Sequence, residues 1–571
     1  MLVDYISHSD RSASRPFFVI ALALLSIFTR GEVHAESVSK EDRLRVAEQI
    51  DRHIESSLDH HLLAPLLSDA AYLRRVTLDL AGRIPSVSEL KHYETLEAND
   101  KKYEVTKQLI ESPDFAYHQR NELDTLLLRA LNNDRQWREY LLETTQNNTP
   151  WDVMFRQIMT PELTLPEDTR PTAFLKHRLR DLDKLANDSS MIWFGVNIGC
   201  AKCHDHPLVD DWKQEHYYGI ASFFKRTYQT KKGMIGERFD GNLRFDTTEG
   251  ETKDAAFMYL TGLSIPEPQL DLEEATLKEY QEQIKKAEQE DSADAPPQPS
   301  FQPRSELVKL ALGDETQNFF AKNIVNRIWA RLFGRGIVHP LDQIHSGNPA
   351  SHPELLNLLT AEFIKNQYDL RSLIHTITLS NTYARSLPIN DGSKDNQTPV
   401  ESASQDHEGF DVTESRFGHA VPRPLSPHQL SLSLLIATDH PEKLKEKIET
   451  NWEQTRGQLE ERSEHFAQKT EIPGENFQTP VSEALWFSNS GEMQNQYLST
   501  DNNHLVGYLK EIESDSEVIS NAFAAILGRP PIQEEHDTLS KYLSSRSDRR
   551  TETIQQIAWV LLCSPEFRFN H

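Results

Sequence analysis

Residues 191–207 read MIWFGVNIGCAKCHDHP, an apolar run that leads into a Cys-x-x-Cys-His motif formed by Cys200, Cys203 and His204. Such a motif lets two thiols add across the two vinyl groups of a haem while the histidine that follows ligates the iron. A zinc or redox Cys-x-x-Cys shares the first four positions. The spacing alone therefore does not choose among these chemistries, and the surroundings of the motif have to decide.

The residues around the motif offer partners for a haem. Aromatic side chains that could cover a macrocycle flank it, although at helical spacing such residues are more often core: Trp193, Phe194, Tyr217, Tyr218, Phe223 and Phe224. A sixth iron ligand could come from His177, His206, His216, Met191 or Met234. Among these, His206 lies too close to the motif in sequence to reach the opposite face of the ring.

A metal site is the rival interpretation of the same residues. Cys200, Cys203, His204 and His206 supply two thiolates and two imidazoles, which is a ligand set of structural zinc. Because Cys203 and His204 are adjacent, they rarely both bind one tetrahedral ion without strain. Asp205 or a distant residue could complete a site for zinc or another divalent metal. A third possibility is a disulfide between the two cysteines or a purely structural role. The disulfide would close a loop of about four residues and contribute roughly 2 kcal/mol to stability.

Composition restricts the class of protein. The chain has 571 residues, enough for two to four domains, and its formal net charge of -27 disfavours a nucleic-acid partner. Three cysteines are too few for a disulfide scaffold in an exported protein. The third, Cys563, is expected to be a small buried hydrophobe.

The first 35 residues have the features of an export signal. Arg11 and Arg15 provide a basic flank, residues 17–28 are apolar, and the segment ends in small residues at Ala35. Cleavage after Ala35 would leave an exported protein, periplasmic or at the cell surface. If the signal is not cleaved, it would anchor the protein, and we expect no other attachment to a membrane. Export also satisfies a condition for haem attachment, since that chemistry takes place outside the cytoplasm.

The remaining sequence predicts a mainly α-helical protein. We expect an N-terminal helical domain over 36–224, a β-rich segment over 225–265 holding the only sheet, a charged helix and Pro-rich linker over 266–304, and a C-terminal helical domain over 305–571. Long helices are predicted over 40–66, 122–145 and 306–333. The runs GRIPSVSE at 82–89 and GRPPIQEE at 528–535, followed by SPDF at 112–115 and SPEF at 564–567, indicate a helical hairpin duplicated near the two ends.

The sequence contains two further polar clusters. His352 could face a cleft shared with Asp342 and His345, although a histidine beside a proline at a helix start is more often structural. Arg327, Arg331 and Arg335 form a basic stripe that could bind an anion, with salt bridges as the expected use. The sequence contains no phosphate-binding loop, nucleophile elbow or metalloprotease helix, and we assign no catalytic residue.

Several runs together resemble a known family: RVTLDLAGRIP at 75–85, GCAKCHDHP at 199–207, QEHYY at 214–218, VNRIWARLFGRG at 325–336, NPASHPELL at 348–356 and SNTY at 380–383. They are similar to the planctomycete cytochrome-associated secreted proteins, whose two core regions are the domains of unknown function 1549 and 1553. The resemblance covers nearly the whole chain after the signal. Residues 207–212 depart from the family pattern, which leaves the geometry of that loop open. The resemblance implies no particular activity.

The sequence thus favours an exported c-type-cytochrome-like protein with haem c attached at Cys200, Cys203 and His204, transferring electrons to a redox partner protein. The alternative is a binding or scaffold protein at the cell surface, in which His204, His206 and Asp205 hold a structural metal or the two cysteines form a disulfide. Its oligomeric state is open.

Overall fold

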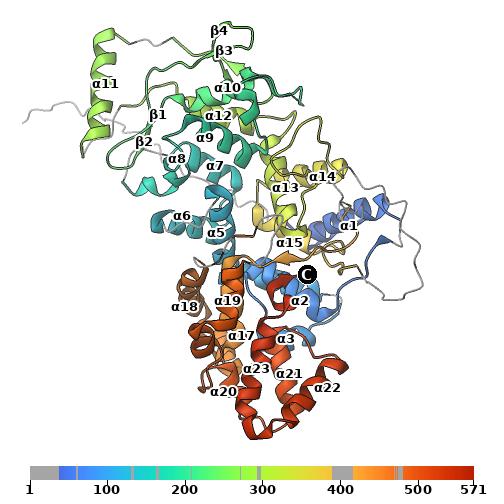
Figure 1. Cartoon of the computed structure of the whole chain (residues 1–571). Helices are drawn as coiled ribbons and strands as arrows, with labels where there is room; N and C mark the ends of the chain where they lie inside the picture. The colour runs from blue at the N-terminus through green and yellow to red at the C-terminus, as the bar shows by residue number, and fades with distance from the viewer. Residues whose placement is uncertain are drawn as a thin grey trace, which may run out of the picture. The chain divides into compact units, whose positions relative to one another are not determined.

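The computed structural model describes residues 38–571 apart from 60–61, 99, 130–133, 162–165, 208, 270–271, 292–296, 389–415, 468–469, 471 and 474–479. The expected export signal lies outside these residues. The described chain is mainly helical, as predicted (Figure 1). In this part of the chain no helix is long and apolar enough to cross a membrane.

The first half of the chain is a series of helices: α1 (Lys40–Ser57), α2 (Asp69–Ala81), α3 (Val87–Thr95), α4 (Lys101–Glu111), α5 (Pro113–Leu128), α6 (Arg135–Gln146), α7 (Trp151–Met159), α8 (Ala173–Lys176), α9 (Leu182–Ser189) and α10 (Gln214–Lys225). The prediction of one helix over 40–66 was too long, because Leu58 is extended and ends α1. The helix predicted over 122–145 is two helices. Arg129 adopts a left-handed conformation with φ of 56° and ends α5, and Asp134 caps the start of α6.

Short hairpins follow α10, as predicted. Three antiparallel pairs form here: β1 (Thr227–Gln229) with β2 (Ile235–Glu237), β3 (Arg244–Asp246) with β4 (Thr252–Asp254), and β5 (Phe257–Met258) with β6 (Ser264–Ile265). The expectation that this region holds the only sheet was wrong. A fourth pair joins β7 (Arg423–Pro424) to β8 (Phe569–Asn570), and its strands are too short to show a periodic pattern in the sequence.

The second half is again helical: α11 (Glu274–Gln289), α12 (Pro303–Leu312), α13 (Phe319–Phe333), α14 (Pro353–Lys365), α15 (Leu370–Thr378), α17 (Pro427–Thr438), α18 (Pro441–Ala467), α19 (Val481–Asn489), α20 (Leu505–Leu509), α21 (Asp515–Ile526), α22 (Gln533–Ser544), α23 (Arg550–Leu562) and α24 (Pro565–Arg568). The helix predicted over 306–333 breaks after Leu312. There, the Asp314 carboxylate accepts hydrogen bonds from the backbone of Thr316 and Gln317, which favours a turn.

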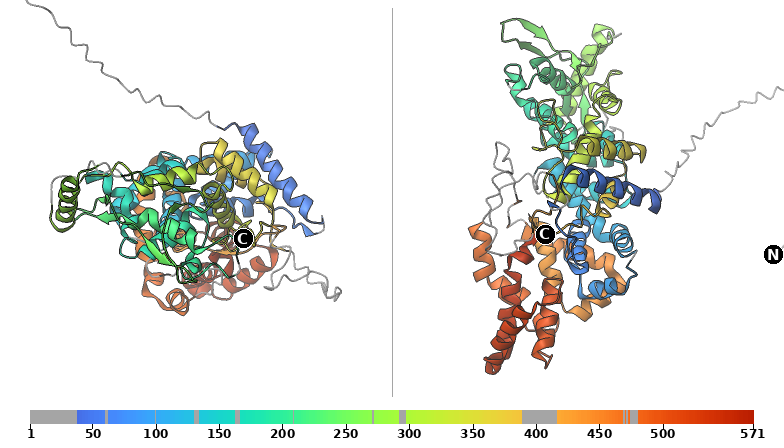
Figure 2. Two further views of the ribbon diagram at one scale, coloured as in Figure 1. Left: turned by 90° about the horizontal axis from the view of Figure 1, so that it is seen from above. Right: turned by 90° about the vertical axis from the view of Figure 1, so that its right-hand side faces the viewer.

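Buried apolar side chains form two large clusters. The first runs from Val46 through the helices before the β hairpins and continues into α12–α15, ending at Phe417. The second is formed by α17–α24 and takes in Leu78 and Ile84 from the region of α2. Helices α21, α22 and α23 of this second cluster pack side by side (Figure 1 and Figure 2). The first cluster therefore joins segments that lie before and after the Pro-rich stretch.

The duplicated hairpin is present in the structure. In the first copy, α2 ends at Gly82 with φ of 70°, and Arg83 donates two hydrogen bonds to Glu89, both of 2.8 Å. In the second copy, Gly528 has φ of 71°, and Arg529 donates to Glu535 at 2.7 and 2.8 Å.

Each arginine also reaches the acid that opens a later helix. Arg83 pairs with Asp114 at the start of α5, and Arg529 pairs with Glu566 in α24. The two runs recognised in the sequence thus build the same ion-paired turn twice, which explains why they share Gly, Arg, Pro and Glu.

Candidate functional site

The Cys-x-x-Cys-His motif lies on a short 3₁₀ turn. The chain reaches it through α9 and a π-helical turn over Ser190–Phe194, and it reverses at Gly195, whose φ is 70°. A Cβ at Gly195 would lie 2.6 Å from Cδ1 of Ile344, so only glycine fits here. The turn itself spans Gly199–Lys202, with Cys203 as its C-terminal flanking residue.

The two thiols are exposed and unbonded. Cys200 and Cys203 are both free and both on the surface, while Ala201 between them is fully buried and anchors the turn. Because a 3₁₀ helix has three residues per turn, side chains at i and i+3 lie on the same side. The three-residue separation of the two exposed cysteines therefore favours placing both thiols on one face of the turn.

His204 is exposed, and its ring orientation is fixed by a hydrogen bond. Nδ1 lies 2.7 Å from the backbone carbonyl oxygen of Asp205. A carbonyl oxygen only accepts, so Nδ1 must carry the proton, and Nε2 is left with a lone pair. This is the arrangement that prepares an imidazole to ligate a metal through Nε2.

Asp205 has a structural role that the sequence did not reveal. Its Oδ1 accepts the backbone N–H of Gln214 at 3.0 Å, the first residue of α10. Gln214 in turn donates its side-chain amide to the carbonyl oxygen of Lys202. Asp205 thus satisfies a free N–H at the start of α10 and ties the helix to the motif.

A loop from the second half of the chain braces the motif. The backbone N–H of Asn197 donates to the carbonyl oxygen of Asp342 at 2.9 Å, and that of Ile344 donates to Gly195 at 3.0 Å. Ser346 bonds to Asp211 through its backbone N–H and its hydroxyl, at 2.7 and 2.6 Å. The motif is therefore held by residues more than a hundred positions away.

His352 has the structural role that was the more expected of its two alternatives. His352 contacts Ser57 through Nε2 at 2.9 Å, which agrees with a structural role. Asp342 pairs with Arg129 and Arg327 instead. His345 lies in the loop that braces the motif, where burial lowers its pKa against the opposing attraction of Asp211.

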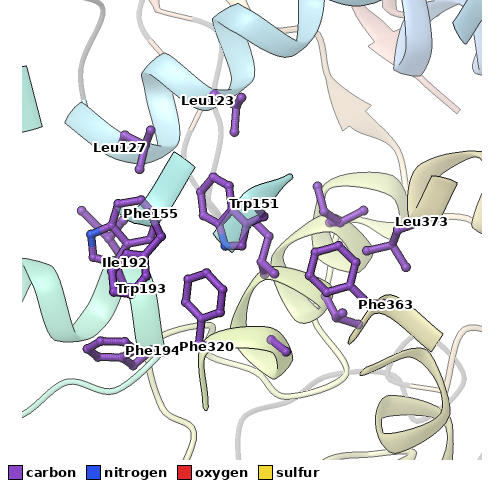
Figure 3. Packing of buried hydrophobic residues seen from close by; sticks show 14 of the residues in the cluster. Leu123, Leu127, Trp151, Phe155, Ile192, Trp193, Phe194, Phe320, Phe363 and Leu373 are labelled. Atoms are coloured by element: carbon purple, nitrogen blue, oxygen red, sulfur yellow. The ribbon is translucent and has the colours of Figure 1, made fainter. Parts of the chain in front are cut away.

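Most of the aromatic residues around the motif belong to the core. Trp193, Phe194, Tyr217, Phe223 and Phe224 are at most 1 % exposed. Trp193 packs against Trp151, Phe155 and Phe320, as Figure 3 shows. These side chains are already covered by protein and cannot form the face of an external binding slot.

Tyr218 is the exception among these aromatic residues. It is half-buried and stacks on Phe245, with ring centroids 4.3 Å apart and planes 8° from parallel. Burial raises the pKa of its hydroxyl, and Cys203 adds to the rise because it lies close by. Phe245 is buried, so Tyr218 alone of the pair is partly open to solvent near the second thiol.

The residues considered as a sixth iron ligand range from exposed to buried. His177 is exposed at the end of α8, and Met234 is half-buried in the β1–β2 turn. Met191 is buried, with its sulfur 3.8 Å from the side-chain nitrogen of Asn187. His216 Nδ1 accepts the backbone N–H of Lys213 at 3.2 Å, and burial lowers its pKa.

His206 is half-buried, and its backbone N–H donates to the carbonyl oxygen of Trp212 at 2.8 Å, which closes the loop over 206–212. Across the described ranges of the chain, no three His, Cys, Asp or Glu side chains are grouped so that they could hold a metal ion. The haem ligands proposed from the sequence need no such group of three.

Comparison with known proteins gives two matches. Residues 49–229 match the family model described as PSCyt2, Protein of unknown function (DUF1549). Residues 303–543 match the one described as PSD1, Protein of unknown function (DUF1553). No curated protein and no solved structure matches the chain. The first match contains the Cys-x-x-Cys-His turn, and the second contains the loop that braces it.

Proposed function

This chain belongs to the planctomycete cytochrome-associated family in which DUF1549 is followed by DUF1553, and from that premise we propose that it is a c-type-cytochrome-like protein with haem attached covalently at Cys200 and Cys203. The observation that carries the proposal is the exposed turn. It holds two free thiols on one face, and the residue after them is a histidine whose Nδ1 is already engaged.

Attachment needs two free thiols that can reach two vinyl groups of one ring. In each addition the sulfur bonds to one vinyl carbon and the thiol hydrogen ends on the other, so no oxidant is consumed. Cys200 and Cys203 meet this requirement because they are not bonded to each other, are exposed and stand three positions apart. Buried or disulfide-bonded cysteines would not.

The residues next to the thiols suit the same ligand. His204 would hold the iron through Nε2, since its Nδ1–H donates to the carbonyl oxygen of Asp205. The half-buried ring of Tyr218, backed by the buried Phe245, offers apolar surface near Cys203. A haem bound here would accept and release one electron at a time, and its place on an exposed turn would allow a partner protein to approach it closely.

Location is part of the proposal. The basic flank, apolar run and small residues over 1–35 support export to the periplasm or the cell surface, where haem attachment occurs. The alternative is a binding or scaffold protein with a structural metal or disulfide at the same residues. It has weaker support, because Asp205 already caps α10 and the described residues group no three metal ligands.

The decisive experiment is to express the full chain in a host that exports it and attaches haem c. We expect an intact mass increased by one haem and a pyridine haemochrome spectrum of the c type. Cys200→Ser and Cys203→Ser should each reduce covalent attachment, whereas Cys563→Ser, far from the motif in sequence, should not. A colourless protein with the mass of the bare polypeptide would overturn the proposal. One zinc per chain by elemental analysis would then favour the alternative.

A further inference from the structure

A second polar site lies away from the cysteine motif. It is a cavity of about 210 Å³ between α5, α13 and the start of α17, lined among others by His118, Glu122, Arg331, Arg423 and His428. Drug-sized ligands occupy pockets of roughly 300–1,000 Å³, so the occupant of this one would be a smaller molecule. Of these residues, only Arg331 belongs to a pattern that is visible in the sequence, the basic stripe of Arg327, Arg331 and Arg335.

Arg331 brings an unpaired guanidinium edge to the cavity. Its Nη1 donates to the side-chain oxygen of Gln119 at 2.9 Å. Its Nε and Nη2 are buried and have no hydrogen-bond partner among the residues that the structure describes. These two nitrogens form the side edge of the guanidinium group, whose parallel N–H bonds match the two oxygens of a carboxylate. Leaving such donors unpaired is costly unless a ligand satisfies them.

The other arginine in the cavity is fully engaged. Arg423 donates to both oxygens of Asp79, at 2.9 and 2.8 Å, and to the backbone carbonyl oxygen of Arg331. Asp79 also accepts from Tyr383 and Asn570. The charges of Arg423 and Asp79 therefore cancel each other, and Arg331 remains as the cation available to a ligand.

Glu122 is the acid that faces Arg331 without touching it. No ion pair joins the two side chains within the described part of the chain, although each affects the titration of the other. Burial raises the pKa of Glu122 more than Arg331 lowers it. The Nδ1 atom of His118 lies 4.0 Å from the carboxylate of Glu122. One cation and one acid thus share a cavity with a gap between them.

The remaining lining residues are neutral at physiological pH. Burial lowers the pKa of His118 to about 3 and that of His428 to about 4. His428 also lies in the first turn of α17, a twelve-residue helix whose positive end favours an anion nearby. The anion-binding potential of the cavity therefore rests on Arg331 with support from α17.

We propose that this cavity binds a small carboxylic acid that also carries a hydrogen-bond donor, with the carboxylate on the Nε–Nη2 edge of Arg331 and the donor on Glu122. Hydroxy acids and amino acids share this chemistry. The site is independent of haem attachment, so either proposal can fail without the other.

Saturation-transfer NMR on the purified full chain tests the proposal with three probes: L-lactate, L-serine and propionate. Propionate has the carboxylate but lacks the donor. We expect saturable binding of lactate, serine or both, and weaker binding of propionate. The preferred probe tells whether the donor is a hydroxyl or an ammonium group. Absence of saturable binding by all three would overturn the proposal.

Variants separate the two contacts. Arg331→Gln should weaken binding of every probe about tenfold or more, since a charge-assisted pair is lost, and Arg331→Lys should recover only part of it. Glu122→Gln should reduce the preference over propionate while leaving propionate binding unchanged. Arg335→Gln, from the same basic stripe but outside the cavity lining, is the matched control. Circular dichroism should confirm that each variant is folded. Unchanged binding in folded Arg331→Gln and Arg331→Lys would contradict the assignment.

Discussion

Ser346 holds Asp211 by two hydrogen bonds, from its backbone N–H at 2.7 Å and its hydroxyl at 2.6 Å. Burial raises the pKa of Asp211, but these bonds and the nearby His345 outweigh that effect and lower it overall. The pair joins the loop that follows the cysteine motif to a loop of the other family region. It is the clearest single tie between the two matched regions at this site.

We predict that Ser346→Ala loosens the motif. Loss of the hydroxyl bond to a charged carboxylate at the surface should cost about 1 kcal/mol of unfolding free energy. Hydrogen exchange of backbone amides over 197–212 should accelerate more than elsewhere. Asp210→Asn, a change at the exposed neighbouring acid, serves as control and should leave exchange as it is. Equal exchange in the two variants would mean that the serine does not restrain the loop.

The duplicated turn allows a matched comparison of burial. The side chains of Arg83, Glu89 and Asp114 are 2 %, 27 % and 1 % exposed, whereas those of Arg529, Glu535 and Glu566 are 26 %, 30 % and 26 % exposed. Removing one partner of a buried pair leaves a buried charge, which costs about 3–5 kcal/mol. Surface pairs contribute about 0–1 kcal/mol.

Removal of Arg83 leaves buried Asp114 with Arg456 as its remaining cation. We therefore expect Arg83→Met to lower the unfolding free energy by about 2 kcal/mol or more, and Arg529→Met by about 1 kcal/mol. Urea denaturation followed by circular dichroism measures both. Similar losses in the two copies would show that burial does not set the strength of this turn.

Stability should also depend on pH through His375. This side chain is 4 % exposed and contacts the hydroxyl of Thr106 at 3.0 Å. Burial lowers its pKa to about 3, and Arg43 and Lys107 add to the effect. Below about pH 6.5 the unfolded histidine binds a proton that the folded one does not. The contribution of neutral His375 to the unfolding free energy is therefore complete above about pH 6.5, and it decreases as the pH falls below that value.

At pH 5 the loss attributable to His375 amounts to about 2 kcal/mol. His375→Gln can keep a hydrogen bond but cannot titrate, so the variant should lose less stability between pH 7.5 and pH 5 than the parent protein. His92→Gln, at an exposed position, is the control. A parallel pH profile for the parent and His375→Gln would contradict a buried neutral histidine.

The three cysteines should differ in reactivity. Cys563 is exposed as a residue, which corrects the expectation of a buried hydrophobe, yet partial burial raises the pKa of its thiol to about 11. At pH 8 only about 0.1 % of it would be thiolate. In protein made without haem, iodoacetamide at pH 8 should label Cys200 and Cys203 before Cys563, as peptide mass spectrometry can show. Faster labelling of Cys563 would contradict its raised pKa.

Local signals were enough to predict many elements of this fold. The runs shared by 82–89 and 528–535 predicted two similar turns, and the structure contains both, each with an arginine bonded to a glutamate six residues on. Helix breaks were missed where a single residue ended the pattern, as at Arg129. This exposed residue adopts a left-handed conformation and pairs with the distant Asp342, and neither feature leaves a mark on hydrophobic spacing.

The site was predictable as a motif but not as a geometry. The sequence singled out Cys200, Cys203 and His204, yet it gave no sign that Asp205 caps α10 or that Ser346 holds Asp211. Both contacts depend on tertiary structure. The unpaired edge of Arg331 was also missed. The spacing of the basic stripe favoured salt bridges, and the structure shows one for Arg327 with Asp342 but leaves Nε and Nη2 of Arg331 without a partner among the described residues.

The apolar cluster that runs from Val46 to Phe417 draws on both family regions. The interior of this cluster is thus shared by the two matched regions, whereas the second cluster is formed mainly by α17–α24. Division of the chain at the Pro-rich stretch would expose apolar surface of this cluster on both fragments. Fusions and domain exchanges should therefore keep the two matched regions together.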